Sequence, residues 1–470
     1  MDDDTTTMTT LSRPPMFRSV MRRRPAGLSL RWLALVLAGL GLASPVRASE
    51  APEPVPDAPV AADGTSLVWS AFGTLGWAQS NRSWRYQRYI DESGGFHRDS
   101  VLGAQLDARF TPEWSATLQV RLAPSASHES RWDLRTSWAF VGWRPDNDWL
   151  VRAGKLRVPF FLRSEQLDVG QTYDEARLPA ELYTIAPSSD FTGVHVSRSM
   201  DLSDGELSVD AYSGTAHLVK RGWLREGLPP QLPAGAVFNE GDTHSTGLVF
   251  TWTAPRAKVR AGAHYVRTKA RSDTSFLVRP VWAQLGPGVG YWQSSNALPG
   301  PGVETIDSFR NYLFVLGGEF GLSGGWRVSP EVARVIQADT EMGVDSWGAA
   351  LTVSREIGRL TPYVSFAMLH STDRSLAMTE SLESTRVPAV VPGGTMLNAS
   401  MRAVADRTVT FRQRSWALGA SYSLTPQSKL KAEWLHTRAS RSAMFDVPAG
   451  ESLLTPRSVD VVSISYSFVF

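Results

Sequence analysis

The chain has 470 residues and a formal net charge of +2, and 20% of its residues are charged. It contains no cysteine, which excludes a disulfide framework, thiol catalysis, iron–sulfur clusters and cysteine zinc sites. After residue 48 no apolar run approaches the length of about 20 residues that a membrane-spanning helix needs, so a helical membrane protein is also excluded.

The N-terminal segment has the pattern of an export signal. Arginines precede an apolar stretch of 12 residues, and Val46 and Ala48 occupy the −3 and −1 positions of a signal-peptidase site. We therefore predict a signal peptide over residues 1–48, with the true start at Met16 or Met21. The alternative, a signal anchor, is disfavoured because this apolar stretch is too short to span a bilayer.

The predicted mature chain begins near Ser49. Seven arginines and three aspartates precede this residue, so the mature chain has a net charge of about −2, which gives no support to nucleic-acid binding. Residues 49–64 are rich in proline and acidic side chains and cannot bury apolar surface, so we expect a disordered periplasmic lead-in.

From Leu67 to Phe470 the sequence alternates between apolar and polar residues in segments of about ten residues separated by turn residues, which is the pattern of a transmembrane β-barrel. The candidate strands are 66–79, 100–111, 113–123, 132–143, 148–158, 191–199, 206–215, 244–253, 257–268, 308–320, 325–337, 345–355, 360–371, 409–424, 427–439 and 457–470. The predicted fold is an all-β, transmembrane antiparallel β-barrel of 16 strands over residues 65–470, with about 14 or 18 strands as alternatives.

Short and long connections alternate along this region. Turns follow the even strands, as at 111–113 and 144–147, whereas most odd strands are followed by long connections, at 80–99, 159–190, 216–243, 269–307, 372–408 and 440–456. Outer-membrane barrels have short periplasmic turns and long external loops, and an even strand count leaves both termini periplasmic. A soluble propeller or sandwich, the alternative, gives no reason to put every long loop at one end.

The alternation also predicts which face of each strand meets lipid. In the third strand Trp114 and Leu118 share one face, and Arg121 lies on the other. Arginine near the midplane of the lipid face costs about 2–4 kcal/mol, so the charged face must line a polar interior. Trp114, Trp149 and Trp326 lie beside predicted periplasmic turns, where indole suits the headgroup boundary.

The final strand has apolar and aromatic residues at alternate positions, at Val462, Ile464, Tyr466, Phe468 and Phe470. It resembles the closing strand of bacterial outer-membrane proteins, whose aromatic alternation and terminal Phe are recognised by the barrel-assembly machinery. The resemblance implies that Phe470 is an assembly signal and that the protein resides in the cell outer membrane of a Gram-negative bacterium.

A second resemblance covers residues 149–193. The segments RAGKLRVP at 152–159, SE at 164–165, DVG at 168–170, PAELY at 179–183 and DFTG at 190–193 are similar to the strand and constriction loop of Gram-negative porins, including relatives of the phosphate-selective and substrate-specific porins. The resemblance implies that loop 159–190, the third external loop, folds inward to shape an eyelet and that three barrels associate. The Pro-Glu-Phe-Gly-Gly tip of enteric porins is absent, and lysine is too scarce to carry over the lysine-rich sites of phosphate porins.

Charged residues in this loop and on the predicted lumen faces are the candidate pore-lining and constriction residues. The loop contributes Arg163, Glu165, Asp168, Asp174, Glu175 and Arg177, and the strands contribute Arg109, Arg121, Arg135, Arg152, Lys258 and Arg260. An acidic loop facing an arginine wall would create a transverse field that filters ions by charge. The alternative is that the arginines pair with Asp107, Asp133 and the loop acids and only hold the loop in place.

We therefore expect a water-filled channel for passive diffusion, a homotrimer in contact with outer-membrane lipid and lipopolysaccharide, with small hydrophilic solutes and no metal or other cofactor. The alternative is an outer-membrane transporter for a specific or hydrophobic substrate. An outer-membrane enzyme is less favoured, because none of the eight histidines lies in a catalytic signature and His436 has no visible acid partner. A plugged receptor needs about 22 strands and is too large for this chain. The aromatic residues Phe160, Phe161, Tyr173 and Tyr183 predict either a sugar slide or packing of the loop.

Overall fold

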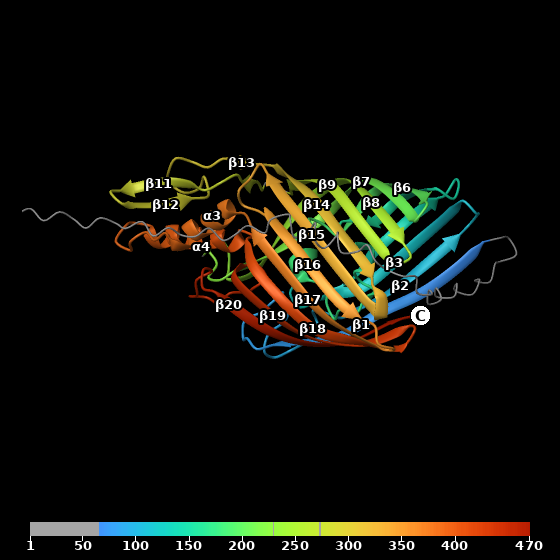
Figure 1. The fold of residues 1–470 in the computed structure, drawn as a ribbon. Coiled ribbons are helices and arrows are strands. Elements are labelled where there is room, and N and C mark those ends of the chain that lie inside the picture. The colour runs from blue at the N-terminus through green and yellow to red at the C-terminus, as the bar shows by residue number, and fades with distance from the viewer. Residues whose placement is uncertain (1–64, 229, 272–273) are drawn as a thin grey trace, which may run out of the picture. The chain divides into compact units, whose positions relative to one another are not determined.

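The computed structural model describes residues 65–228, 230–271 and 274–470. Sixteen strands of this part close into one barrel in chain order, with every neighbouring pair antiparallel and β1 paired with β20 (Figure 1). The predicted all-β barrel of 16 strands is confirmed. The predicted signal peptide at 1–48 and lead-in at 49–64 lie outside the described residues.

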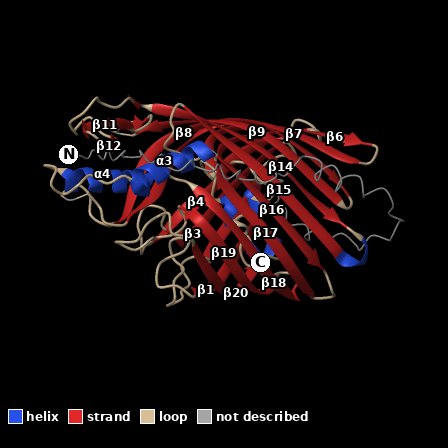
Figure 2. Cartoon of the chain, turned by 60° about the vertical axis from the view of Figure 1, so that its left-hand side comes forward, coloured by secondary structure: helices blue, strands red, loops and turns tan. Residues whose placement is uncertain are grey.

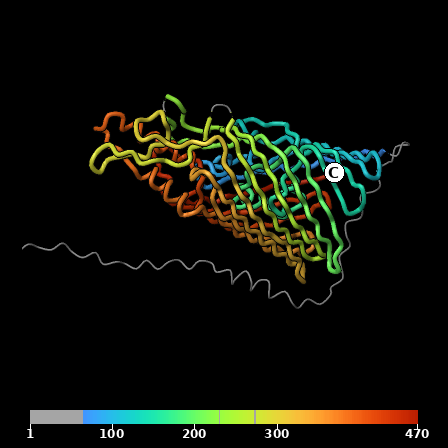
Figure 3. The backbone as a smooth tube through the Cα atoms, turned by 90° about the horizontal axis from the view of Figure 1, so that it is seen from above, coloured from blue at the N-terminus to red at the C-terminus, as the bar shows by residue number. Residues whose placement is uncertain are grey.

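The wall strands are β1 (Ser66–Ser80), β2 (Val101–Arg109), β3 (Trp114–Pro124), β4 (Trp132–Trp143), β5 (Trp149–Arg157), β6 (Asp190–Leu202), β7 (Gly205–Leu224), β8 (Gly235–Ala254), β9 (Ala257–Ala270), β14 (Ser308–Gly321), β15 (Trp326–Ala338), β16 (Ser346–Arg355), β17 (Leu360–Ser371), β18 (Phe411–Thr425), β19 (Ser428–Ser442) and β20 (Arg457–Val469). They run side by side at a common slant (Figure 3). Adjacent strands satisfy one another's backbone groups, so the closed wall leaves no free sheet edge.

The boundaries predicted for the seventh and eighth strands were wrong. We expected an open connection over 216–243, but β7 and β8 continue pairing as far as Leu224 and Gly235. The predicted boundaries end both strands at about the length that crosses a bilayer. Antiparallel pairing does not need lipid, so the strands can continue beyond the bilayer as long as their backbones remain paired, as they do over residues 216–224.

Two other long connections contain regular structure. Residues 269–307 hold two small hairpins, formed by β10 (Phe276–Leu277) with β13 (Thr305–Ile306) and by β11 (Val281–Gly286) with β12 (Val289–Gln293). Residues 372–408 hold α3 (Asp373–Ser384) and α4 (Gly394–Arg407), which lie at the same end of the barrel as β11 and β12 (Figure 2). No helix in the described residues is long and apolar enough to cross a membrane.

The two faces of the wall differ in polarity as the alternation predicts. On β18, Trp416 and Leu418 are exposed on the outside, whereas Gln413 and Ser415 are buried on the inside. The exposed fractions of the three tryptophans beside the turns are 46%, 37% and 43% for Trp114, Trp149 and Trp326. An apolar exterior with aromatic side chains near its rim is the surface that a lipid bilayer requires.

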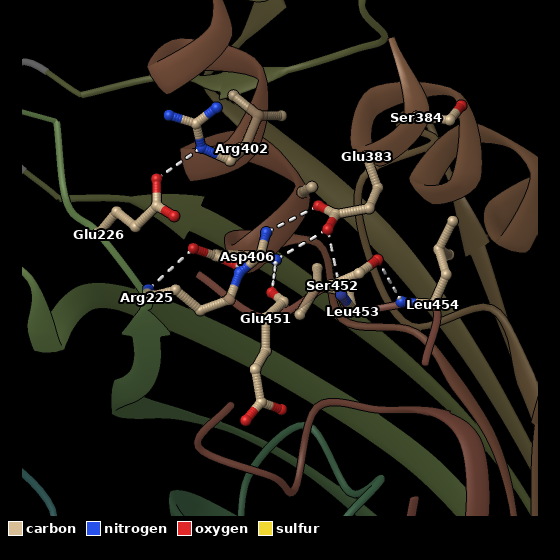
Figure 4. A network of polar contacts seen from close by, with 12 residues as sticks. Arg225, Glu226, Glu383, Ser384, Arg402, Asp406, Glu451, Ser452, Leu453 and Leu454 are labelled. Carbon is tan, nitrogen blue, oxygen red and sulfur yellow. Dashed lines mark hydrogen bonds and ion pairs between the residues drawn. The ribbon is translucent and has the colours of Figure 1, made fainter. Parts of the chain in front are cut away.

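A buried ionic cluster ties α3 and α4 to the end of β7 (Figure 4). Arg225 donates to Glu383 on α3 at 2.7 and 2.8 Å and to Asp406 on α4 at 2.6 Å, and all three side chains are at most 3% exposed. Burial raises the pKa of Asp406 above its usual value. Burial would also raise the pKa of Glu383, but hydrogen bonds from Arg225 hold it below its usual value.

Replacing Arg225 by Met should release the helical layer from the barrel. The substitution leaves two buried carboxylates without their cation, and breaking a buried pair in this way costs about 3–5 kcal/mol. We expect rapid proteolytic cleavage within residues 372–408 while the barrel itself stays folded. The control is Arg402→Met, which removes the more exposed pair with Glu226 (Figure 4) and should change little. Equal protease resistance of the two variants would contradict this assignment.

Candidate functional site

The segment between β5 and β6 leaves the barrel wall after Arg157 and rejoins it at Asp190. It contains short 3₁₀ turns at Ser164–Gln166 and Gly170–Thr172 and one turn of helix, α2 (Ala180–Tyr183). Many of its hydrogen-bond partners lie on β14, β15 and β17 to β20, on the opposite side of the ring of strands. The contacts of this segment with the wall define the candidate site.

The first anchor of the segment is Glu331 on β15. Its carboxylate accepts hydrogen bonds from the Leu162 backbone N–H at 2.7 Å and from the Tyr183 hydroxyl at 3.1 Å, so it joins the two ends of the segment. Beside it, Arg163 donates to Glu319 on β14 at 2.7 Å. Because Glu331 accepts one bond from a backbone N–H and one from a hydroxyl, it fixes both the backbone at Leu162 and the side chain of Tyr183.

Asp174 forms the second anchor, in the middle of the segment. Its carboxylate accepts from Ser421 at 2.8 Å and from Lys429 at 2.9 Å, and it pairs with Arg327 at 3.2 Å. These three partners come from three different strands. Burial would raise the pKa of Asp174, but Lys429 and the other donors hold it below its usual value.

A third set of contacts joins the segment to the near wall and to the β1–β2 connection. Asp168 accepts from Arg121 at 2.7 Å and also contacts Arg157, whereas Arg177 donates to Asp99 at 2.8 and 2.5 Å. Burial would raise the pKa of Asp99, but Arg177 holds it below its usual value. The segment is therefore held by two kinds of ion pair. It contributes the acidic group at Asp168 and the basic group at Arg177.

Most of the predicted charged residues meet at this segment. Glu165 lies 3.8 Å from Arg152 and 4.0 Å from Arg260, and Arg260 donates to the Phe161 carbonyl at 2.8 Å. Glu175 is buried, and its backbone carbonyl accepts from Lys431 at 2.9 Å.

Three predicted residues do not join the segment directly. Arg135 pairs with Asp133 on its own strand at 2.8 Å. The side chains of Arg109 and Lys258 have no hydrogen bond or ion pair with any residue in the described ranges. In the alternative that has the arginines pair with Asp107 and Asp133, only Asp133 pairs with an arginine, because Asp107 accepts from Thr117 and Gln105.

The sequence prediction missed several anchors. Alternation would have placed Glu331 and Lys431 on lumen faces, but neither lies near the segment in sequence. Arg157 was missed because regular alternation puts it opposite to Arg152, yet both side chains contact the segment. Between them Gly154 has φ of +136°, a conformation that favours glycine, and the alternation is not kept across it.

The expectation that His436 lacks an acid partner is also wrong. Its Nδ1 lies 2.7 Å from Asp460, which Asn81 also contacts at 2.9 Å. No serine or other nucleophile contacts this histidine in the described residues. Within the same ranges no cluster of His, Asp and Glu could hold a metal ion.

The aromatic residues of the segment divide into two groups. Phe160 and Phe161 are at most 2% exposed, and Phe160 packs edge-on against His264 with a centroid distance of 4.8 Å. They fit the packing alternative, since buried rings cannot contact a passing solute. Tyr173 borders open space, and its ring lies 4.0 Å from the Lys431 ammonium.

A cavity of about 560 Å³ remains between the segment, the inner faces of β1 to β3 and β19 to β20, and the connection between β1 and β2. Besides His97, its lining carries six arginine and lysine side chains and two acidic ones, namely Arg88, Arg98, Arg121, Arg177, Arg221, Lys431, Asp99 and Asp168. Because basic groups dominate the lining, the cavity favours anions over cations.

Gly170 allows the segment to approach the wall closely. A Cβ added there would lie 2.5 Å from the hydroxyls of both Ser467 and Thr74. Gly170→Val should therefore lower the free energy of unfolding by about 1–3 kcal/mol through overpacking. Gly95→Val is the matched control, because no atom lies within 4 Å of its added Cβ. Denaturant unfolding of both variants tests this prediction. Equal unfolding midpoints of the two variants would show that Gly170 is not in tight contact with the wall.

Acid should loosen the segment through Asp99 and Asp174. Both pKa values are below the usual 3.8, so each ion pair adds stability that is present above that pH and is lost as pH falls through the folded-state pKa. We expect proteolysis within residues 163–182 to stay constant from about pH 5 to 8 and to rise only below about pH 4. An acid-resistant protease such as pepsin suits the low-pH arm. A rise already at pH 6 would contradict this account.

No protein-family profile and no curated protein matches the chain. Solved structures similar to it include the outer membrane channel DcaP of Acinetobacter baumannii, with 10% identity over 88% of this chain and 99% of that chain and a TM-score of 0.48. Outer-membrane expressed OmpT of Vibrio cholerae has 12% identity over 87% and 99%, with a TM-score of 0.48. A mutant Rh. blastica porin has 10% identity over 86% and 100%, with a TM-score of 0.39. At these values the similarities concern the fold alone and give no argument about function.

Proposed function

We propose that this chain is an outer-membrane porin of a Gram-negative bacterium, which forms a water-filled channel for passive diffusion of ions and small hydrophilic solutes. The observation that carries the proposal is the combination of a closed 16-strand wall, an apolar exterior and a charged lumen beside an open cavity. Barrels of this strand number are wide enough for an aqueous channel, whereas eight-stranded barrels are filled by side chains.

The segment 159–190 narrows this channel in our proposal and forms its eyelet. Support comes from its anchors on opposite walls, Glu331 and Asp174 on one side and Asp168 on the other. In this proposal the wall arginines both hold the loop in place and contribute to the field that filters ions. Arg121 and Arg152 pair with loop acids, and they also border the path along which an ion passes.

Outer-membrane lipid, including lipopolysaccharide, is a proposed partner of the exterior. Arg412, Arg414 and Arg438 face outward, and Arg414 lies directly opposite Arg438 on the neighbouring strand. None of the three has a hydrogen bond or ion pair with a residue in the described ranges. Like charges in direct cross-strand pairs are unfavourable, and phosphate groups of lipid would offset their repulsion.

Assembly at the barrel seam is the proposed role of Phe470. Its backbone exchanges two hydrogen bonds with Ala71 on β1, at 2.7 and 2.9 Å, while its ring stays 65% exposed beside Trp69. An exposed terminal ring at the closing seam suits recognition by the barrel-assembly machinery before closure. A homotrimer is proposed with the porin function and is tested by the same recordings.

The second candidate is a transporter for a specific or hydrophobic substrate. A hydrophobic substrate is disfavoured because basic side chains line the cavity. An enzyme is disfavoured as well, since His436 pairs with Asp460 and no serine or threonine hydroxyl of the described residues is hydrogen-bonded to it. Hydrolysis of lipid or peptide by the purified barrel would instead favour the enzyme as the function of this chain.

Recording from the folded protein in planar bilayers tests the proposal. We expect steady ohmic steps in groups of three and a reversal potential in a KCl gradient that favours chloride. Heat-modifiable mobility on gels verifies that the barrel is folded. No conductance from correctly folded protein would overturn the porin and favour a gated transporter.

A further inference from the structure

We propose that the 560 Å³ cavity is a binding subsite for small oxyanions, solutes that carry a carboxylate or a phosphate group. The subsite deepens the proposed porin function and rests on it for its place on a transport path. It lies between the β1–β2 connection and the segment 159–190.

Arg98 provides the main free charge of the subsite. Its Nε donates to the Gln87 side-chain carbonyl at 3.0 Å. No carboxylate among the described residues lies within 4.0 Å of its guanidinium, so its remaining N–H groups are available. A guanidinium presents its donors as a planar fork that matches the two oxygens of a carboxylate or phosphate.

Two further donors belong to residues that line the same space. Arg177 uses Nε and Nη2 on Asp99 and Ser463, which leaves Nη1 buried and without a hydrogen-bond partner among the described residues. The Tyr89 hydroxyl is likewise buried with no hydrogen-bond partner in the described part of the chain. Buried donors are almost always satisfied, so two unpaired ones on lining residues suggest that an acceptor binds beside them.

The acids of the lining cannot supply that acceptor. Asp99 is already bound by Arg177, and Asp168 by Arg121 and Arg157. Arg221 and Arg88 use acids outside the lining, Glu129 in both cases.

Lys431 is a second basic lining group. It is 2% exposed and donates to the carbonyls of Gly170 and Glu175 at 2.6 and 2.9 Å, and no carboxylate among the described residues lies within 4.0 Å of its amine. Arg98 and Lys431 are thus two basic groups of the lining that form no ion pair in the described part of the chain. Neutral sugars and apolar solutes do not use such charges, which is why the geometry favours oxyanions.

Equilibrium binding to the folded, detergent-solubilised protein tests this, with inorganic phosphate and succinate as separate probes and glycerol as the neutral control. We expect saturable binding of at least one oxyanion and none of glycerol. Arg98→Gln should weaken that binding by about tenfold or more, the value of a charge-assisted hydrogen bond. Arg98→Lys, which keeps the charge but loses the fork, should restore only part of it.

The control variant is Arg267→Gln, which removes the same charge from the outward face of β9, where Arg267 bonds only to Ser308. It should bind as the parent does. The phosphate and succinate arms decide which oxyanion the subsite prefers. No saturable binding, or equal binding by Arg98→Gln and the parent, would overturn the subsite. Binding without bilayer conductance would overturn the porin instead, so the two failures are distinguishable.

Discussion

Deletion of residues 164–182, with the ends joined by a short glycine–serine linker, should raise the single-channel conductance several-fold. These residues carry the Asp174 anchor and most of the segment between β5 and β6, which is bonded to strands on the opposite side of the ring. Without them the remaining charges face water, and the lumen approaches the width that a 16-strand wall encloses. Planar-bilayer recording of the refolded variant measures the effect.

The control is a deletion of residues 389–390, between α3 and α4, where both side chains are exposed and Val390 is 90% exposed. It removes chain from the external layer and should leave conductance near the parental value. Circular dichroism and heat-modifiable mobility check that both deletions fold. Parental conductance in a folded 164–182 deletion would show that the segment does not limit the current.

Neutralising Arg121 and Arg152 together, as Arg121→Gln and Arg152→Gln, should shift the channel away from anions. Asp168 keeps Arg157, and Glu165 keeps Arg260 at 4.0 Å, so the variant loses two positive charges without leaving a bare buried acid. The anion-to-cation permeability ratio should fall by about threefold or more, and the change should shrink at high salt as charges are screened. Reversal potentials in KCl gradients at two ionic strengths measure it.

The matched control is the double variant Arg144→Gln and Arg267→Gln, which removes the same charge from a turn and from the outer face. It should keep the parental reversal potential. An unchanged reversal potential in the variant with Arg121→Gln and Arg152→Gln would mean that Arg121 and Arg152 have a purely structural role.

The barrel could be predicted from sequence because the alternation of apolar and polar residues in each strand shows which face meets lipid. The two faces of β18 follow directly from Trp416, Leu418, Gln413 and Ser415. The extra length of β7 and β8 could not be predicted in the same way. Beyond the bilayer no lipid imposes a boundary, so strand ends there depend on pairing with a partner strand.

The site was predictable only for residues that lie close in sequence or on regular strands. Arg121, Arg152 and Asp168 were found because alternation and the loop composition point to them. Their counterparts across the lumen, such as Lys429, are separated from the loop by more than half the chain, and only closure of the barrel brings them together. Arg157 required knowledge of the backbone at Gly154.

The most direct test of the central claim uses the absence of native cysteine. A single cysteine in place of Ala176, which lines the cavity and keeps its backbone bond to Tyr363, is exposed to a bulky anionic thiol reagent during bilayer recording. Val390→Cys, on the exposed external loop, is the control. The account predicts stepwise loss of current on labelling of Ala176→Cys and no change for Val390→Cys. Full labelling of Ala176→Cys with no change in current would contradict the claim that this segment borders the ion path.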